Sequence, residues 1–600
     1  MSKSTVRSEH TFHIPVMGTG FTIDTPLRVA KYGISSAISL VDDSLIEQIR
    51  KYHCEQHGEA YEEIPSSDDD PRANRITAYL NLLDRLVARQ VKKLQASPFE
   101  PGSEITKYFE LLPDSALKQK YLEMLSCNNF GEKARLQEQL RPAAVPGSID
   151  VNIMSKGDSN AYRDGKKRPQ KYSDAMAALR GFGSSTLKGS IVFSAGMNPH
   201  LYSYVAEFDD FFPDEDGLLK KKIILKVSDY RSAVIQGKFF AKRGLWVSEY
   251  RIESGLNCGG HAFATKGLLM GPILEEFKQK KTELRDQLHR MYTKGLKAIG
   301  RKVINEPLET LITAQGGIGT PEENDFLRKR YNVDSTGWGT PFMLVPEAVC
   351  LDDEHLGKLL KATEEDVILS DNSPFGLPFW NLKNSGSENA RRSRIEQDTP
   401  GSVCRKTHVR FNSEFTEIPI CTASRNYQRR KLKQIENDGL TEEQRLWFGE
   451  HVLAKSCICH DLGGCITIKY GIDPDASPAL CPGPGIADFS KAATLKEMVD
   501  HIYGRKSLPL RGDRKQMFLK EIELYVDYVR QEIKLHRMKI VPRPDGYFAG
   551  VKESLLNGID YYKNIAGDMP LENDEKFLDE LKLQRKEAEI ILSVEEEEQV

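Results

Sequence analysis

Eight short segments of strand length, nearly all followed by a polar loop and then a helical pattern, predict an α/β protein built on a closed (β/α)8 TIM barrel. In chain order the segments are 13–17, 36–40, 149–153, 190–193, 222–227, 245–252, 310–313 and 332–334. The loops after them are rich in glycine, hydroxyl, amide and histidine side chains, whereas Lys, Arg and Glu predominate at the opposite strand ends. Because functional groups in this fold lie on the loops that follow the strands, we expect the site there.

One helical insertion interrupts the barrel after the second strand, at about 54–145, so that the barrel as a whole spans 1–350. The insertion has Pro71 at a helix start, apolar residues at helical spacing behind it, and further helical patterns at 105–112 and 116–125. We expect it to pack on or near the barrel mouth and to be mostly surface decoration.

After residue 350 the alternation of strands and helices stops. We expect a loop-rich connecting region at 351–440 and a mostly helical C-terminal region at 441–600, with the Gly-, Ser- and Arg-rich stretch 381–402 as an exposed loop. Thr441 and Gln444 have capping-box spacing for a helix to about Lys455, and apolar spacing predicts a long helix at 517–533. Aromatic residues Phe375, Phe379 and Trp380 are assigned to the core.

The composition is that of an ordinary globular protein. Hydrophobic residues are 39% and charged residues 28% of the 600, which excludes collagen-like, disordered and disulfide-scaffold classes. Lys+Arg 84 against Asp+Glu 87 leaves a net charge of -3, so no basic field predicts nucleic acid or a membrane surface as partner. The start of the chain does not resemble a secretory signal, and we expect a soluble, cytoplasmic protein with reduced cysteines.

Two glycine-rich turns follow the seventh and eighth predicted strands, AQGGIGTPEE at 314–323 and STGWGTPF at 335–342. Barrels commonly bind phosphate with these two loops, because glycine lets backbone N–H groups approach the anion closely. The turns therefore predict a phosphate-bearing ligand, with two ordinary tight turns as the alternative. Neither an ATP-binding P-loop nor a separate Rossmann motif is found in the sequence.

Gly259 and Gly260 lead into His261 at the end of the sixth strand. A histidine at this place faces the ring region of a ligand whose phosphate lies at the last two strands, and its near-neutral pKa suits proton transfer. We predict His261 as an acid-base residue; the alternative is a structural histidine.

In this order and at suitable separations, IPVMGTGF at 14–21, the GGH at 259–261, AQGGI and VDSTGWGTPF resemble the FMN-dependent barrels of the nitronate monooxygenase (2-nitropropane dioxygenase) family. Flavin-dependent enoyl-acyl-carrier-protein reductases of the same superfamily are similar. The resemblance covers roughly 12–350. It implies FMN as cofactor, His261 as the acid-base residue beside it, and Gly259 and Gly260 next to the flavin. By the same resemblance Gly316, Gly317, Gly339 and Thr340 hold the FMN phosphate, and Gly18 and Asn152 lie along the isoalloxazine and ribityl side.

Two features depart from the family pattern: Pro341 stands where the family has Arg in the motif GTRF, and the insertion is foreign to compact members. The resemblance implies an oxidoreductase that oxidises a nitronate, nitroalkane or similar carbanion-forming small molecule with O2. One alternative is an enoyl reductase that uses NAD(P)H and an acyl thioester; another is a non-catalytic, metal-stabilised scaffold. We expect a small-molecule substrate, no nucleic-acid or membrane partner, and a homodimer as one option.

Four of the ten cysteines lie close together in sequence: Cys457, Cys459, Cys465 and Cys481. Four thiols could complete a zinc or iron-sulfur shell, but the spacing C-x-C-x5-C-x15-C matches no standard pattern. We favour a buried structural segment that packs against the barrel mouth. Metal binding, or a redox role for Cys457 and Cys459, is the alternative, and the other six cysteines are predicted to have no role.

Overall fold

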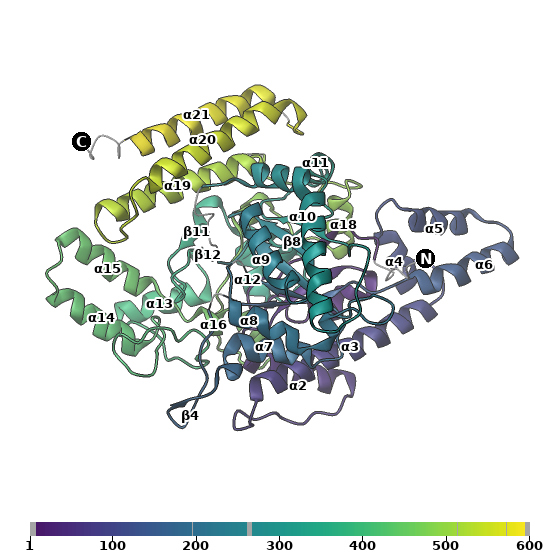
Figure 1. The fold of residues 1–600 in the computed structure, drawn as a ribbon, viewed down its shortest axis with the longest axis horizontal. Coiled ribbons are helices and arrows are strands. Elements are labelled where there is room, and N and C mark those ends of the chain that lie inside the picture. Colours follow the sequence, from purple (N-terminus) through teal and green to yellow (C-terminus); the bar gives the residue numbers. More distant parts are fainter. Residues whose placement is uncertain are drawn as a thin grey trace.

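The computed structural model describes residues 8–155, 157–194, 196–260, 267–512, 514–571 and 573–593. Its centre is a closed barrel in which every strand pairs in parallel with its neighbours, in the order β1-β10-β9-β8-β7-β6-β3-β2 (Figure 1). The strands are β1 (Phe12–Ile14), β2 (Ser35–Ser39), β3 (Ile149–Ile153), β6 (Ser190–Phe193), β7 (Lys222–Val227), β8 (Val247–Glu253), β9 (Leu311–Gln315) and β10 (Ser335–Gly337). The predicted fold class is confirmed.

The predicted bounds of the third, fourth and fifth strands match the structure. The eighth was placed too early, at 332–334, because Asn332 ends the preceding helix in a left-handed conformation (φ 53°) and the strand starts only at Ser335. Helices that surround the barrel are α1 (Thr25–Val29), α2 (Asp43–His57), α7 (Asp174–Gly183), α8 (Pro199–Tyr204), α9 (Tyr230–Ala241), α10 (Met270–Ala298) and α11 (Pro321–Tyr331).

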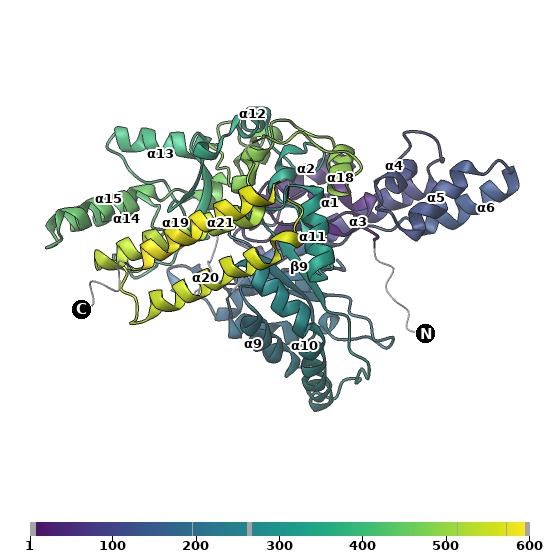
Figure 2. The same ribbon diagram turned by 90° about the horizontal axis from the view of Figure 1, so that it is seen from above.

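The helical insertion consists of α3 (Pro71–Ala96), α4 (Glu104–Leu111), α5 (Ala116–Ser126) and α6 (Phe130–Leu140). α3 packs between α2 and α7 in the outer layer. α4 lies at the end of the barrel opposite the mouth, where Tyr108 accepts a hydrogen bond of 3.1 Å from the N–H of Val145, shortly before β3. α5 and α6 project away from the barrel (Figures 1 and 2). The expectation that the insertion packs at the mouth was therefore wrong for α4 to α6.

The C-terminal part is mostly helical and packs on the barrel. Its elements are α12 (Asp353–Lys361), the antiparallel pair β11 (Val367–Ser370) and β12 (Phe379–Leu382), α13 (Gly386–Glu396), α14 (Arg425–Asn437), α15 (Glu442–Ala454), α16 (Ile458–Asp461), α17 (Gly464–Lys469), α18 (Leu495–Ile502), α19 (Met517–Arg537), α20 (Tyr547–Ile565) and α21 (Asp574–Ser593). Figure 2 shows α19, α20 and α21 side by side. α15 begins at the predicted capping box of Thr441 and Gln444, and α19 contains the predicted 517–533 helix.

The stretch 381–402, predicted as an exposed loop, contains helix α13 instead. The polar composition of this stretch suggested a loop, but its charged side chains pair with one another within the helix. Ser385 caps the helix, and Glu388, which is buried, accepts a hydrogen bond of 2.8 Å from Arg391. Among the described residues, no helix combines the length and the apolar character that crossing a bilayer requires.

Candidate active site at the barrel mouth

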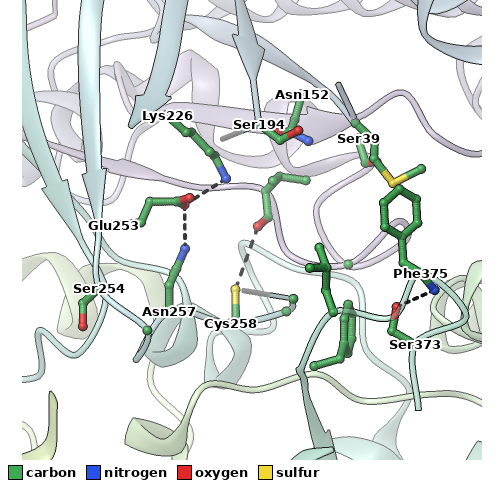
Figure 3. A pocket seen from close by; sticks show the side chains of 18 of the residues that line it. Ser39, Asn152, Ser194, Lys226, Glu253, Ser254, Asn257, Cys258, Ser373 and Phe375 are labelled. Atoms are coloured by element: carbon green, nitrogen blue, oxygen red, sulfur yellow. Dashed lines mark hydrogen bonds and ion pairs between the residues drawn. The ribbon is translucent and has the colours of Figure 1, made fainter. Parts of the chain in front are cut away.

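A large cavity lies at the carboxyl ends of the barrel strands, with an empty volume of about 1690 Å³ that includes its opening to solvent. Ser39, Asn152, Lys226 and Glu253 line it from the ends of four strands, β2, β3, β7 and β8 (Figure 3). The cavity therefore lies where ligands bind in this fold.

Residues of the C-terminal region form the opposite wall of this cavity. Phe375, Phe379, Val409, Cys459 and Tyr525 line it. The aromatic residues assigned to the core thus divide: Trp380 is buried and its indole N–H donates to the Gly255 carbonyl at 2.9 Å, whereas Phe375 and Phe379 face the cavity. An apolar wall of this kind keeps water away from whatever the cavity binds.

Four residues predicted to lie beside a flavin ring, namely Gly18, Asn152, Gly259 and Gly260, all line the large cavity. Gly18 and Gly259 have positive φ angles of 53° and 86°, which favour glycine. His261, the predicted acid-base residue, lies outside the described residues.

Two buried oxygen atoms at the cavity have no hydrogen-bond partner among the described residues: Oδ1 of Asn152 and Oγ1 of Thr19. A buried polar atom without a partner costs about 1–3 kcal/mol, and a ligand that hydrogen-bonds to it offsets this cost. Because both residues line the same cavity, the two atoms indicate a place for polar groups of a ligand.

A charged network lies at the floor of the cavity. The ammonium of Lys226 is 2.9 Å from the Glu253 carboxylate, which also accepts a hydrogen bond of 3.0 Å from Asn257 (Figure 3). The same carboxylate accepts a hydrogen bond from Gln315. Gln315 in turn contacts Nε2 of His13 at 3.2 Å, and burial together with the nearby Arg251 and Lys226 holds the pKa of His13 well below its usual value. Among the described barrel residues that line the cavity, Lys226 is thus the cation, and it is paired with Glu253.

Glu521, which α19 contributes to the cavity wall, is fully buried, and burial raises its pKa to about 7. Its carboxyl oxygens each accept from the N–H of Met270 at 3.1 Å, and one also accepts from the Tyr562 hydroxyl at 2.9 Å. Burial likewise raises the pKa of the Cys258 thiol to about 12, so this cysteine is a neutral thiol and not a nucleophile at neutral pH.

A second, smaller cavity, with an empty volume of about 330 Å³ that includes its opening to solvent, is lined by all four predicted phosphate residues, Gly316, Gly317, Gly339 and Thr340. Asn257 lines both cavities, so the two are neighbours. Gly316 and Gly317 have φ angles of 107° and 81°, and a Cβ added to Gly317 would come within 2.6 Å of Leu256. Glycine is thus favoured at both positions of the turn after β9 by the positive φ angles, and at Gly317 also because a Cβ would not fit.

At the N-terminus of α11, next to the smaller cavity, a carboxylate of the protein itself accepts hydrogen bonds. Glu323 accepts from the N–H of Gly319 at 2.9 Å and from Arg514 at 2.6 Å. Arg514 also contacts Asp488 at 3.2 Å, and Lys520 contacts Asp488 at 2.6 Å. The two carboxylates, Glu323 and Asp488, are therefore paired with two cations, Arg514 and Lys520. An anion in the smaller cavity would consequently be bound by the backbone N–H groups of the glycine turns.

The four neighbouring cysteines of the sequence do not form one group. Cys457 and Cys459 lie near Cys404 and Cys421, Cys465 lies with Asp352 and His355, and Cys481 lies near Cys258 at the cavity. The carbonyl of Cys481 accepts a hydrogen bond of 3.2 Å from the N–H of Gly259. The segment packs against the mouth as favoured, but a single shell of these four thiols is not formed.

Sequence reasoning missed five polar residues of this site: Thr19, Lys226, Glu253, Asn257 and Glu521. A signal for one of them, Glu253, was present. In β8, Glu249, Arg251 and Glu253 alternate with buried Tyr250 and Ile252, which is the pattern of charged side chains inside a barrel. Glu521 carries no such signal because it lies on the largely apolar face of α19.

Comparison with models of known protein families finds no match, and comparison with curated proteins finds none either. Among solved structures, the chain is similar to FabK from Thermotoga maritima, with 13% identity over 68% of this chain and 86% of that one, at a TM-score of 0.31. It is also similar to nitroalkane oxidase from Streptomyces ansochromogenes, with 9% identity over 83% of this chain and 97% of that one, at a TM-score of 0.34. Similarities this distant carry no argument about family or activity.

Proposed function

We propose that the chain is an FMN-dependent oxidoreductase of the nitronate monooxygenase type, which oxidises a nitronate, a nitroalkane or another small carbanion-forming substrate with O2. The observation that carries the proposal is the pair of neighbouring cavities at the barrel mouth, a large one with two unpartnered oxygens and a small one walled by glycine turns. A flavin mononucleotide needs both kinds of space, one for its ring and one for its phosphate.

The residues present fit this cofactor. Asn152 and Thr19 offer the unpartnered oxygens to its polar edge, and Gly316, Gly317, Gly339 and Thr340 would hold its phosphate. The two carboxylates near the small cavity are each paired with a cation, so they do not repel an anion strongly. When bound, FMN would carry the electrons.

The substrate would be oriented and kept dry by residues of this chain. The ammonium of Lys226, which is paired with Glu253 at the cavity floor, would donate a hydrogen bond to the negatively charged group of a nitronate or carbanion. Phe375 and Phe379 exclude water from the other side. His261 is the proposed base that removes the proton of a neutral nitroalkane.

Absorption of the purified protein tests the proposal. Bound flavin gives bands in the near ultraviolet and the blue, and the cofactor released by heat should chromatograph as FMN. A nitronate added without O2 should bleach the visible band, and O2 should restore it. A colourless protein that binds no added FMN would overturn the proposal in favour of a scaffold. Bleaching by NAD(P)H and reoxidation by an enoyl thioester, with no response to nitronate, would favour the reductase.

A matched pair of lysine variants tests the proposed role of Lys226. Lys226→Met removes the cavity cation and should lower kcat/KM for an anionic nitronate by about 10- to 100-fold. Lys281→Met removes a lysine that pairs with Asp334 on the outside of the barrel at 2.7 Å, and it should leave kcat/KM unchanged. Equal losses in both variants would contradict a charge role at the cavity.

A further inference from the structure

Three buried side chains with different metal-binding groups come together at the start of the C-terminal region. They are Asp352, the residue before α12, His355 in the first turn of α12, and Cys465 in α17. One donor atom from each of the three residues lies within 4.8 Å of the other two. In the part of the chain that the structure describes, no other set of His, Cys, Asp and Glu side chains converges in this way. The three are here termed the Asp-His-Cys group, and none of them lines either cavity at the barrel mouth.

Hydrogen bonds already orient the aspartate and the histidine of this group. Oδ1 of Asp352 accepts from the backbone N–H of His355 at 3.1 Å, as the cap of α12, and contacts Nδ1 of the same histidine at 2.9 Å. The second contact assigns the ring proton to Nδ1, because an ionised carboxylate can only accept. Nε2 then carries a free lone pair, as in metal-binding histidines whose other ring nitrogen is held by a carboxylate.

Two atoms of the group are left without a hydrogen-bond partner among the described residues. They are Oδ2 of Asp352 and Nε2 of His355, and both are buried. Each is an electron-pair donor, so they cannot hydrogen-bond to each other. The thiol of Cys465 has a single proton and is a weak donor, so it can serve at most one of them. A cation that accepts an electron pair from all three residues would satisfy the whole group.

We propose that Asp352, His355 and Cys465 bind one Zn²⁺ ion through Oδ2, Nε2 and Sγ. The thiol proton leaves for solvent as the Zn–S bond forms. One carboxylate and one thiolate then balance the charge of the ion, so the buried site is neutral. Zinc accepts oxygen, nitrogen and sulfur ligands together, whereas Mg²⁺ and Ca²⁺ bind mainly oxygen. Tetrahedral zinc places its ligands roughly 3.3–3.6 Å apart, so no pair of donors has to close by more than about 1.5 Å.

An opening to solvent lies beside the group. It has an empty volume of about 1020 Å³, open solvent included, and Asp352 and His355 line it together with Lys469 and Ser477. The ion can enter through it, and water can take the fourth position on the metal. Cys465 is fully buried and is not among the described residues that line the opening. A nucleophilic thiol activated by the histidine, the other chemistry that such a group suggests, would therefore not reach a substrate.

The ion would join two parts of the chain that both pack on the loop after β1. Shortly before the group, the N–H of Cys350 donates to the Phe21 carbonyl at 3.2 Å. The turn before α17 lies so close to Gly20 that a Cβ there would come within 2.8 Å of the Leu462 carbonyl. Leu462 and Thr19 line the large cavity. Zinc would thus fix one part of the cavity wall from outside the cavity.

Metal analysis of the full chain, purified with reductant and without chelators, tests the proposal. About one zinc per chain is expected. His355→Ala and Cys465→Ala each remove a ligand and should weaken zinc binding at least about 100-fold, more than the loss of an outer-shell partner does. Asp352→Asn should do the same while it keeps the helix cap. Cys350→Ala is the matched control, because Cys350 is equally buried and close in sequence to Asp352, and this variant should keep the zinc.

Cobalt in place of zinc keeps the proposal testable even where the variants fail to fold. The wild-type protein reconstituted with Co²⁺ should show a thiolate-to-cobalt charge-transfer band in the near ultraviolet and the intense visible bands of four-coordinate cobalt. Added Zn²⁺ should abolish both. Peptide maps should show Cys465 unmodified when the zinc-loaded protein is treated with N-ethylmaleimide.

Less than about 0.1 zinc per chain after reconstitution with Zn²⁺ would overturn the proposal. So would zinc that stays in both His355→Ala and Cys465→Ala, a cobalt spectrum without the thiolate band, or iron in place of zinc. Rapid alkylation of Cys465 in the zinc-loaded protein would favour the nucleophilic thiol instead. None of these outcomes depends on the presence of FMN.

Discussion

The backbone N–H of Gly483 donates a hydrogen bond of 3.2 Å to the hydroxyl oxygen of Thr340. Thr340 follows the last strand of the barrel, whereas Gly483 belongs to the C-terminal part of the chain. Because the hydroxyl accepts from Gly483, its own proton remains free to donate to an anion in the smaller cavity. One residue of the proposed phosphate site is thus oriented by a segment outside the barrel.

A methyl group at Gly483 should disturb this arrangement. A Cβ there would come within 2.5 Å of the Leu256 carbonyl and 2.7 Å of the Thr340 hydroxyl, whereas one at Gly439 would meet nothing within 4 Å. Gly483→Ala should therefore destabilise the protein by about 1–3 kcal/mol and weaken FMN binding at least 10-fold. Gly439→Ala is the control, because Gly439 lines neither cavity. Fluorescence titration with FMN and urea unfolding measure both, and similar FMN affinities in the two variants would contradict the prediction.

Removal of the unpartnered hydroxyl of Thr19 should stabilise the ligand-free protein and weaken the holoprotein. Thr19→Val replaces this buried hydroxyl with a methyl group, so the free energy of unfolding without FMN should rise by about 1 kcal/mol. Ser36→Ala removes another buried hydroxyl, which has no partner among the described residues and lines neither cavity, and this variant should stabilise the protein equally. Only Thr19→Val should raise the Kd for FMN. Unchanged FMN affinity in Thr19→Val would remove Thr19 from the proposed site.

Glu521 should make the protein less stable as the pH rises. Burial raises its pKa from 4.5 to about 7, so between these pH values the folded protein retains a proton that the unfolded chain has lost. Stability contributed by this group therefore falls as pH rises through that window, by about 3 kcal/mol in total, and is constant above it. In Glu521→Gln, the difference in unfolding free energy between pH 5 and pH 8 should change by that amount relative to wild type. A parallel pH profile in the variant would refute the assignment.

The proposed acid-base role of His261 has a kinetic consequence. His261→Ala should reduce turnover of a neutral nitroalkane by about 10² to 10⁴ with FMN still bound, because proton abstraction is lost. Turnover of the corresponding nitronate, already deprotonated, should fall much less. His289→Ala is a suitable control, since His289 lies on α10 and its ring contacts the Ile304 carbonyl at 3.0 Å. Equal effects on nitroalkane and nitronate would show that His261 is not the base.

The barrel was predictable from the sequence because its signals are local. A buried parallel strand is a short apolar run between turn residues, and the glycine turns after β9 and β10 stand next to the strands that position them. The displaced eighth strand shows where this reasoning fails. Of Ser335, Thr336 and Gly337 only Thr336 favours a strand, and parallel pairing with β1 and β9 makes the three residues a strand.

The walls of the cavity and the grouping of the cysteines could not be predicted, because both depend on contacts between distant segments. Cys404 and Cys421 had no feature that connects them to Cys457, and sequence proximity grouped the latter with Cys465 and Cys481 instead. Phe375 reads as an ordinary core residue, and only the packing of the C-terminal region on the barrel turns it toward the cavity.

Glu521 and Tyr525 contribute part of the cavity wall, and this part is synthesised after the barrel strands. All eight barrel strands have been synthesised once residue 350 is made, but α19 follows some time later. At roughly 5–20 residues per second, the interval from residue 350 to Tyr525 is about 10 to 35 s. During that interval the nascent barrel has an open, partly apolar mouth. A chaperone or the cofactor itself can reach the cavity then from a direction that the finished protein closes.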